Sequence, residues 1–316
     1  LIFLIRPVFY RLYVDKHYSI NRDACYNEEP IQQKWNGIAQ HVSAVVIGST
    51  DTVVLTLFST LQNVSIYSVY YLVINGLQKI FASATTGFQS YYGELWAKNE
   101  TEILKKSFGY LVWVVHAGTV FVFGCTSLLI VPFINIYTKG VADANYNVPV
   151  FALFITLAYA AYCIRIPYSI MILAGNHYSQ TQKCYTVAVG LNIVVSVITV
   201  KLHGLVGVAV GTLIAMVYQT VWMAVYNSNN LVCWPFSCFL KQLLADVLSF
   251  LPPYFICSTW TLSASSYAAW IYLAVKVSII WIVFIVIINT VFYRDHIISL
   301  LHKLKHVARM RRTGKL

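Results

Sequence analysis

Long apolar segments alternate with short polar ones from one end of the chain to the other. Each long segment has roughly the 20 residues that a transmembrane helix needs, and none shows the period-two alternation of a membrane barrel strand. The pattern therefore predicts an all-α, polytopic membrane helix bundle with one partial and eight full transmembrane helices. The partial span is Leu1–Tyr13, and the full spans are Ile38–Leu61, Ile66–Tyr91, Phe108–Ile136, Pro149–Ala174, Tyr185–Leu202, Leu205–Tyr226, Leu243–Leu262 and Tyr267–Tyr293.

Composition points to the same class of protein. Charged residues make up 10% of the chain and hydrophobic residues 59%, whereas about a quarter of the residues in a soluble domain are charged. This balance excludes an ordinary soluble protein. The net charge is +11, and its distribution among the loops gives the topology.

Basic residues gather in every second loop. The segment Asp15–Lys34 carries Lys16, Arg22 and Lys34, and Gly93–Ser107 carries Lys98, Lys105 and Lys106. The short loops Gln62–Ser65 and Ser263–Ser266 carry no charge. Basic residues beside membrane spans remain on the cytoplasmic side. We therefore expect the segment before the first full span, every second loop after it and the C-terminal tail to be cytoplasmic.

The tail that starts at Arg294 is strongly basic, with Lys303, Lys305, Arg309, Arg311, Arg312 and Lys315. A basic segment next to a membrane is expected to contact anionic lipid headgroups. Nucleic-acid binding has no second feature in the sequence to support it.

Enzymatic and metal-binding functions are not predicted. The seven cysteines are scattered without a CxxC pair, so the sequence predicts neither a metal site nor a cofactor. Paired carboxylates, an HExxH motif and a nucleophile elbow are all missing from the sequence.

The chain opens at Leu1 inside a membrane-like segment without a signal-peptide pattern, which we interpret as the end of a helix that begins upstream.

Four ionisable residues lie inside predicted spans and are the candidate functional residues: Asp51, Lys79, Arg165 and Lys276. Each costs about 2.5–3.5 kcal/mol at the middle of a bilayer on insertion scales. Asp51 and Lys79 lie at similar depths on two antiparallel neighbours, so an ion pair between them is possible. Either that pair only offsets their desolvation, or Asp51 binds a coupling cation or proton and Lys79 an anionic substrate.

Arg165 precedes Pro167, which removes a helical hydrogen bond and is expected to kink the helix there. A planar, permanently charged guanidinium beside a kink suits a phosphate group. The alternative is that Arg165 extends to the cytoplasmic membrane surface. The same two alternatives, a place inside the bundle or at the surface, apply to Lys276.

Three further features are interpreted structurally. Gly207 and Gly211 form a GxxxG motif, which predicts a close-packing face for a neighbouring helix. His116 is expected to be an interior histidine with satisfied hydrogen bonds rather than a proton relay. Pro252–Pro253 is expected to kink the span that contains it, or to form a hinge.

Three stretches, in order, resemble the C-terminal half of polysaccharide and O-antigen flippases of the multidrug/oligosaccharidyl-lipid/polysaccharide exporter superfamily. They are the "TD" region Gly48–Thr52 through Val64–Ser68, then Leu173–His177 with Thr181–Gln182, and Gly204–Ile214. The resemblance implies a two-lobed transporter. Residues 1–34 would be the end of a helix and an inter-lobe segment, 35–228 the second six-helix lobe, 229–293 two additional helices and 294–316 a cytoplasmic tail.

The resemblance also implies a function. Such flippases move oligosaccharides linked to polyprenyl pyrophosphate across the bacterial cytoplasmic membrane, and they commonly line their cavity with lysine and arginine. Lys79, Arg165 and Lys276 are therefore expected to bind substrate, and Asp51, in the "TD" motif, to couple an ion. Other polysaccharide-assembly proteins are expected as partners.

Three alternatives remain open at this point. A cation-coupled multidrug exporter of the same superfamily would favour acidic cavity residues over basic ones. A membrane-embedded polymerase or glycosyltransferase would need a large outer loop, and the longest, Tyr137–Val148, is short. A scaffold subunit of a glycan-assembly complex would not transport at all.

Overall fold

The structure, a computed structural model, describes residues 2–18, 34–260 and 264–299. The described residues are helical, without a strand, as expected. The helices are α1 (Ile2–His17), α2 (Lys34–Phe58), α3 (Leu61–Thr85), α4 (Gly87–Ala97), α5 (Thr101–Tyr137), α6 (Pro149–Ala174), α7 (Tyr178–His203), α8 (Leu205–Asn230), α9 (Phe236–Ser258) and α10 (Tyr267–Phe292).

Seven of these helices are long and apolar enough to cross a membrane: α2 and α5 to α10, among the described residues. They match seven of the eight predicted full spans. The remaining predicted span, Ile66–Tyr91, is divided between α3 and α4, and the division falls at Thr86. The hydroxyl of Thr86 donates to the Ala82 carbonyl, and Gly87 follows; both features weaken a helix. The predicted count of eight full spans is therefore not confirmed.

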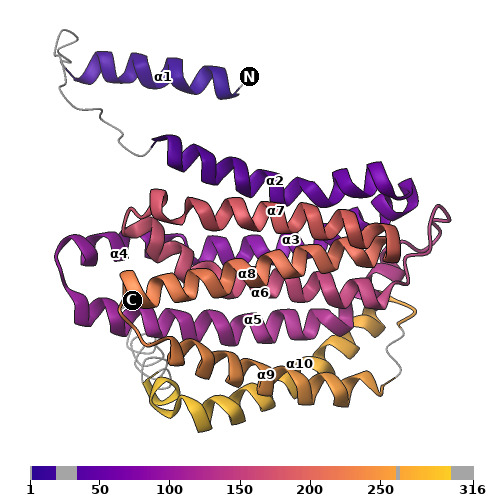
Figure 1. The fold of residues 1–316 in the computed structure, drawn as a ribbon. Helices are drawn as coiled ribbons and strands as arrows, with labels where there is room; N and C mark the ends of the chain where they lie inside the picture. Colours follow the sequence, from indigo (N-terminus) through magenta and orange to yellow (C-terminus); the bar gives the residue numbers. More distant parts are fainter. Residues whose placement is uncertain (1, 19–33, 261–263, 300–316) are drawn as a thin grey trace. The chain divides into compact units, whose positions relative to one another are not determined.

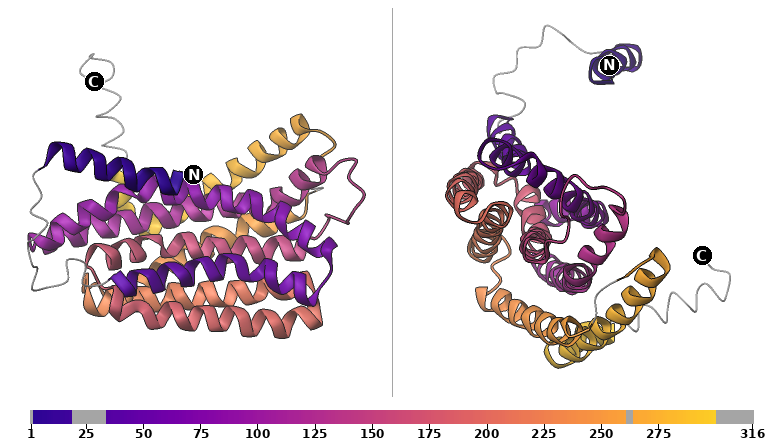
Figure 2. Two further views of the ribbon diagram at one scale, coloured as in Figure 1. Left: turned by 90° about the horizontal axis from the view of Figure 1, so that it is seen from above. Right: turned by 90° about the vertical axis from the view of Figure 1, so that its right-hand side faces the viewer.

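The contacts divide the chain into two units, residues 1–35 and residues 36–316. The first contains α1, which covers most of the predicted partial span and has Pro7 within its length. In the second unit the helices pack into a bundle in which α6 contacts α3, α5 and α8 (Figure 1). Helices α9 and α10 pack against each other and against α5 (Figure 2).

The GxxxG motif packs as predicted. An added Cβ at Gly211 would lie 2.8 Å from the backbone nitrogen of Ser196, and one at Gly207 would lie 2.7 Å from that of Val200. Both contacts are with the backbone of α7, so α7 and α8 approach so closely that only glycine fits at these two positions. The close-packing face predicted from the sequence is confirmed.

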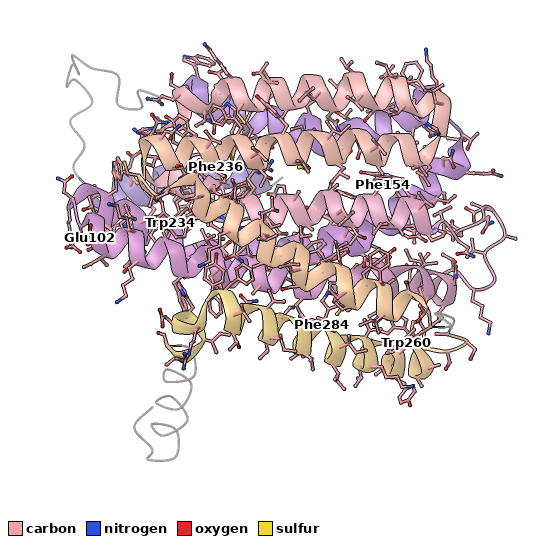
Figure 3. The ribbon with its side chains drawn as sticks, turned by 60° about the horizontal axis from the view of Figure 1, so that its bottom comes forward. Glu102, Phe154, Trp234, Phe236, Trp260 and Phe284 are labelled. Atoms are coloured by element: carbon pink, nitrogen blue, oxygen red, sulfur yellow. The ribbon has the colours of Figure 1, made fainter. Side chains whose placement is uncertain are left out.

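Helix α10 attaches to α5 through indole rings as well as apolar contacts. The Trp113 indole donates to Asn289 of α10 at 2.7 Å, and Trp270 of α10 donates to the Leu129 carbonyl at 3.0 Å. Trp281 is fully buried where Gly124 leaves space for its ring. Trp260, which is labelled in Figure 3, lies two residues beyond the end of α9.

Replacing Gly124 with alanine should loosen this attachment. The new Cβ would lie 2.6 Å from Cε2 of Trp281, so α10 or the indole must move. Overpacking of this kind costs about 1–3 kcal/mol. Thermal unfolding in detergent, followed by tryptophan fluorescence, should therefore start at a lower temperature. Gly118→Ala, on the same helix with 3.4 Å to Phe81, is the control; equal shifts in both variants would contradict the expectation.

Candidate binding cavity

A cavity of about 560 Å³ lies between α2 and the faces of α3, α6, α7 and α8. Helix α2 is not among the closely packed helix pairs of the bundle, which leaves room for the cavity beside it. Its polar lining consists of an imidazole and of hydroxyl, amide and cationic side chains from these helices: His41, Tyr71, Asn75, Gln78, Lys79, Tyr159, Tyr162, Arg165, Tyr185 and Gln219. The lining contains no carboxylate.

Arg165 is buried at the wall of this cavity, with 7% of its surface exposed. Its Nη1 donates to Oε1 of Gln219 and lies 3.7 Å from Sδ of Met216. Its guanidinium carbon lies 4.7 Å from the centre of the Tyr162 ring. These contacts hold the side chain inside the bundle rather than at the membrane surface, and α6 continues through Pro167 to Ala174.

The charge of Arg165 has no carboxylate partner among the described residues. A guanidinium stays protonated at any physiological pH, and an uncompensated buried charge is strongly unfavourable. The amide nitrogen of Gln219 is also buried without a hydrogen-bond acceptor in the described structure. Both groups would gain from an anion in the cavity.

Lys79, on α3, lines the same cavity. The structure thus places two of the three predicted substrate-binding residues, from two different helices, around one space. Lys79 is more exposed than Arg165, and its flexible side chain can reach ligands of different sizes.

A row of tyrosine rings extends along the cavity wall. Tyr71 stacks on Tyr67 at 5.5 Å and meets Tyr159 edge-on at 5.7 Å, and Tyr159 is 6.4 Å from Tyr162. The row ends at Arg165. The sequence analysis missed these residues, although the spacing of Tyr67, Tyr70 and Tyr71 on one helix face was a readable signal.

Asp51 does not pair with Lys79, so the ion pair that the sequence allowed is not formed in the described structure. Its carboxylate is 1% exposed and accepts hydrogen bonds from the hydroxyls of Tyr67, at 2.9 Å, and Thr212, at 2.7 Å. Thr212 in turn accepts from the amide of Asn192 at 3.1 Å. Equal depth in the membrane did not bring the two charges together, because Asp51 faces α3 and α8 while Lys79 faces the cavity.

Lys276 lies elsewhere. It is on α10, where its Nζ is 4.2 Å from the centre of the Tyr272 ring, and it is exposed on the bundle surface. It does not line the cavity that contains Arg165. The structure therefore does not bring the third predicted substrate-binding residue to the other two.

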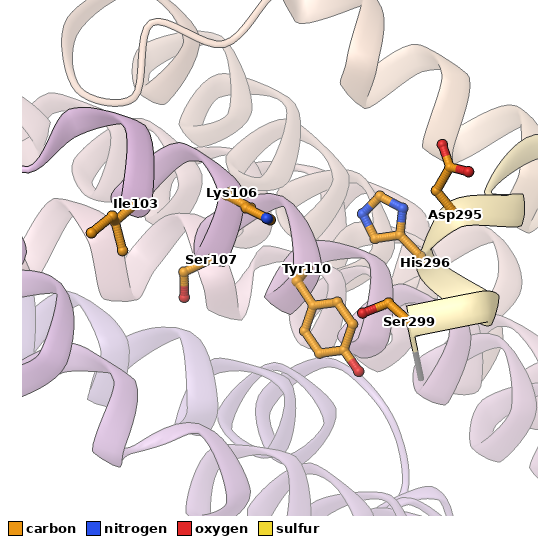
Figure 4. Close-up of a pocket in the computed structure, with 7 residues that line it drawn as sticks. All are labelled: Ile103, Lys106, Ser107, Tyr110, Asp295, His296 and Ser299. Atoms are coloured by element: carbon orange, nitrogen blue, oxygen red, sulfur yellow. The ribbon is translucent and has the colours of Figure 1, made fainter. Parts of the chain in front are cut away.

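A second cleft, of about 420 Å³, opens where α5 begins and the chain leaves α10 (Figure 4). Lys106, Tyr110, Asp295 and His296 are among its lining residues. Burial lowers the pKa of His296, while Asp295 acts in the opposite direction. Because the cleft holds charges of both signs, it lacks the purely cationic character of the Arg165 cavity.

Most of the basic tail lies outside the described residues, as do Arg22 and Cys25.

Comparisons of this chain with protein-family models, curated proteins and solved structures found no match. Clusters of three or more potential metal-binding side chains are also missing from the described residues.

Proposed function

We propose that this chain is part of a transporter that moves oligosaccharides linked to polyprenyl pyrophosphate across the bacterial cytoplasmic membrane. The observation that carries the proposal is Arg165, a buried cation without a carboxylate partner among the described residues, in a cavity whose polar lining also includes Lys79, His41, tyrosines and amides. A pyrophosphate supplies the missing negative charge, and its oxygens match the planar donors of a guanidinium.

The rest of the lining suits the sugar part of such a substrate. Tyrosine rings offer apolar faces that sugar rings can cover, and the amides of Asn75, Gln78 and Gln219 offer donors and acceptors for sugar hydroxyls. The polyprenyl chain would stay in the lipid while the headgroup crosses. We propose alternating access around the cavity, with Lys79 and Arg165 offsetting the desolvation of the pyrophosphate and Asp51 as the ion-coupling residue.

Three further parts of the proposal rest on the sequence. The C-terminal tail would be cytoplasmic and bind anionic lipid, and other polysaccharide-assembly proteins would act as partners. The chain would carry out no covalent chemistry. A cation-coupled multidrug exporter is the second candidate, but a cavity whose fixed charges are Lys79 and Arg165 repels cationic drugs.

A flipping assay tests the proposal. The full-length protein, reconstituted in liposomes, should accelerate the exchange of a fluorescent polyprenyl-pyrophosphate oligosaccharide between leaflets. Exchange is measured as the fraction of label that an added membrane-impermeant reductant quenches. If protein-containing and empty liposomes give equal rates, the chain is not a flippase of this substrate and the scaffold alternative gains support.

A further inference from the structure

A buried histidine–aspartate pair joins α5 to α9, outside the Arg165 cavity. Nδ1 of His116 lies 2.5 Å from Oδ2 of Asp246, and Gln242 donates to the other carboxylate oxygen at 3.1 Å. His116 is completely buried and Asp246 is 7% exposed. Both helices are long and apolar enough to cross a membrane. The pair is therefore a titratable site within the membrane-spanning part of the bundle.

The sequence analysis overlooked Asp246 because α9 starts earlier than expected. The predicted span began at Leu243, which put Asp246 at its edge, whereas the helix begins at Phe236. Asp246 follows Phe236 by 10 residues, which is about 15 Å along a helix. A carboxylate at that depth is costly and is commonly functional in a membrane protein.

Several buried polar atoms near the pair have no hydrogen-bond partner in the described structure: Nε2 of His116 and the hydroxyl oxygens of Thr119, Tyr168 and Ser249. Thr119 and Ser249 each lie three residues beyond a member of the pair, and Tyr168 contacts Phe239, the ring that also touches His116. Thr119 and Asp246 line an apolar groove of about 280 Å³. Buried polar atoms usually have partners, so a group of unpaired ones around this histidine–aspartate pair calls for a functional explanation.

The charge of this site depends on one proton. Among the described residues, His116 is the basic group that contacts Asp246. The other titratable groups near it are Tyr168 of α6 and Tyr293 after α10, with Cys238 and Lys241 of α9 beside Tyr293. Helix α8 has no charged residue. With the proton bound, an imidazolium and a carboxylate compensate each other; without it, a negative charge is left buried.

We propose that the His116–Asp246 pair is a proton-binding site, separate from Asp51, and that the proton it binds couples to transport. The inference rests on the proposed transport function. The proton is held on the imidazole and released to solvent, and no bond between heavy atoms changes. Its loss weakens the α5–α9 contact, because an uncompensated carboxylate favours contact with water. Helix α9 contains Pro252 and Pro253 beyond the pair, where it lacks backbone donors and can bend.

The first experiment detects the proton directly. The full-length protein, with ¹⁵N-labelled histidine and in lipid vesicles without substrate, is followed by solid-state NMR as the pH is varied. The imidazole signal of His116 is identified by its absence in His116→Gln. In the unmodified protein that signal should change between its neutral and protonated forms. In Asp246→Asn that signal should stay neutral throughout, and Asp246→Glu should restore the change. Asp143→Asn, in an exposed outer loop, is the control. A His116 signal that is constant in the unmodified protein, or unchanged by Asp246→Asn, would overturn the proposal.

The second experiment tests coupling. An imposed pH gradient across the liposome membrane should accelerate flipping by the unmodified protein by about tenfold, a barrier change near 1.4 kcal/mol. Asp246→Asn and His116→Gln should lose this acceleration and keep exchange without a gradient. Undiminished acceleration in both variants would overturn the coupling role. If the unmodified protein flips nothing, the proposed function fails, while the NMR titration still decides whether the pair binds a proton.

Discussion

Replacing Arg165 with alanine should reduce flipping of a polyprenyl-pyrophosphate oligosaccharide by about ten- to a hundredfold. Hydrogen bonds to a charged group contribute about 1.5–3 kcal/mol, and each 1.4 kcal/mol is a factor of ten in rate. Arg165 is the buried cation of the cavity, and Gln219 holds its guanidinium in place. The measurement is the initial rate of leaflet exchange in liposomes at equal protein content.

Two companion variants separate charge from geometry. Arg165→Lys keeps the charge but cannot offer two parallel donors to a phosphate, so it should recover only part of the rate. Lys201→Ala is the control, since Lys201 is a cation at the end of α7 that does not line the cavity. Full activity in a correctly folded Arg165→Ala protein would contradict the assignment of Arg165 to the substrate.

Replacing Gly211 with leucine should prevent α7 and α8 from packing. Even a Cβ would lie 2.8 Å from the backbone nitrogen of Ser196, and backbone cannot move aside as a flexible side chain can. Overpacking of a core usually costs about 1–3 kcal/mol. Because this leucine would contact backbone, we expect its cost to lie at or above the upper end of that range. We expect little monodisperse protein after detergent extraction and a lower unfolding temperature for what remains.

The matched control for this prediction is Gly190→Ala on α7. A Cβ at Gly190 meets nothing within 4 Å, and alanine has a higher helix propensity than glycine. Its stability should therefore equal or slightly exceed that of the unmodified protein. An unfolding temperature for Gly211→Leu that matches the Gly190→Ala value would show that the two helices do not need their close contact.

The membrane spans could be predicted from the sequence because they depend on local composition. The bounds Pro149–Ala174 are those of α6, and the spacing of Gly207 and Gly211 gave their packing face. The division of Ile66–Tyr91 was missed because Thr86 and Gly87 are a brief interruption in a segment that already contains the polar residues Asn75, Gln78 and Lys79. Helix α3 is 25 residues long, but it is not among the helices that are apolar enough to cross a membrane.

The residues of the candidate binding cavity could be predicted only in part, because the sequence shows local features and not long-range packing. Unusual charges in apolar segments identified Lys79 and Arg165, which the structure places around one cavity. Depth along a helix is readable from sequence, but the direction a residue faces depends on packing with distant segments. Asp51 therefore accepts a hydrogen bond from Thr212, 161 positions away, and does not pair with Lys79. The contact of His116 with Asp246, 130 positions apart, could not be predicted from the sequence for the same reason.

The most direct test of an anion-binding cavity is the affinity of the purified full-length protein for polyprenyl pyrophosphate, measured by native mass spectrometry in detergent. Lys201→Ala should bind as tightly as the unmodified protein. Lys79→Ala and Arg165→Ala should each bind more weakly, and the double variant should bind at least about tenfold more weakly, a loss of 1.4 kcal/mol or more. Equal affinity in the double variant and the unmodified protein would show that the pyrophosphate does not bind in this cavity.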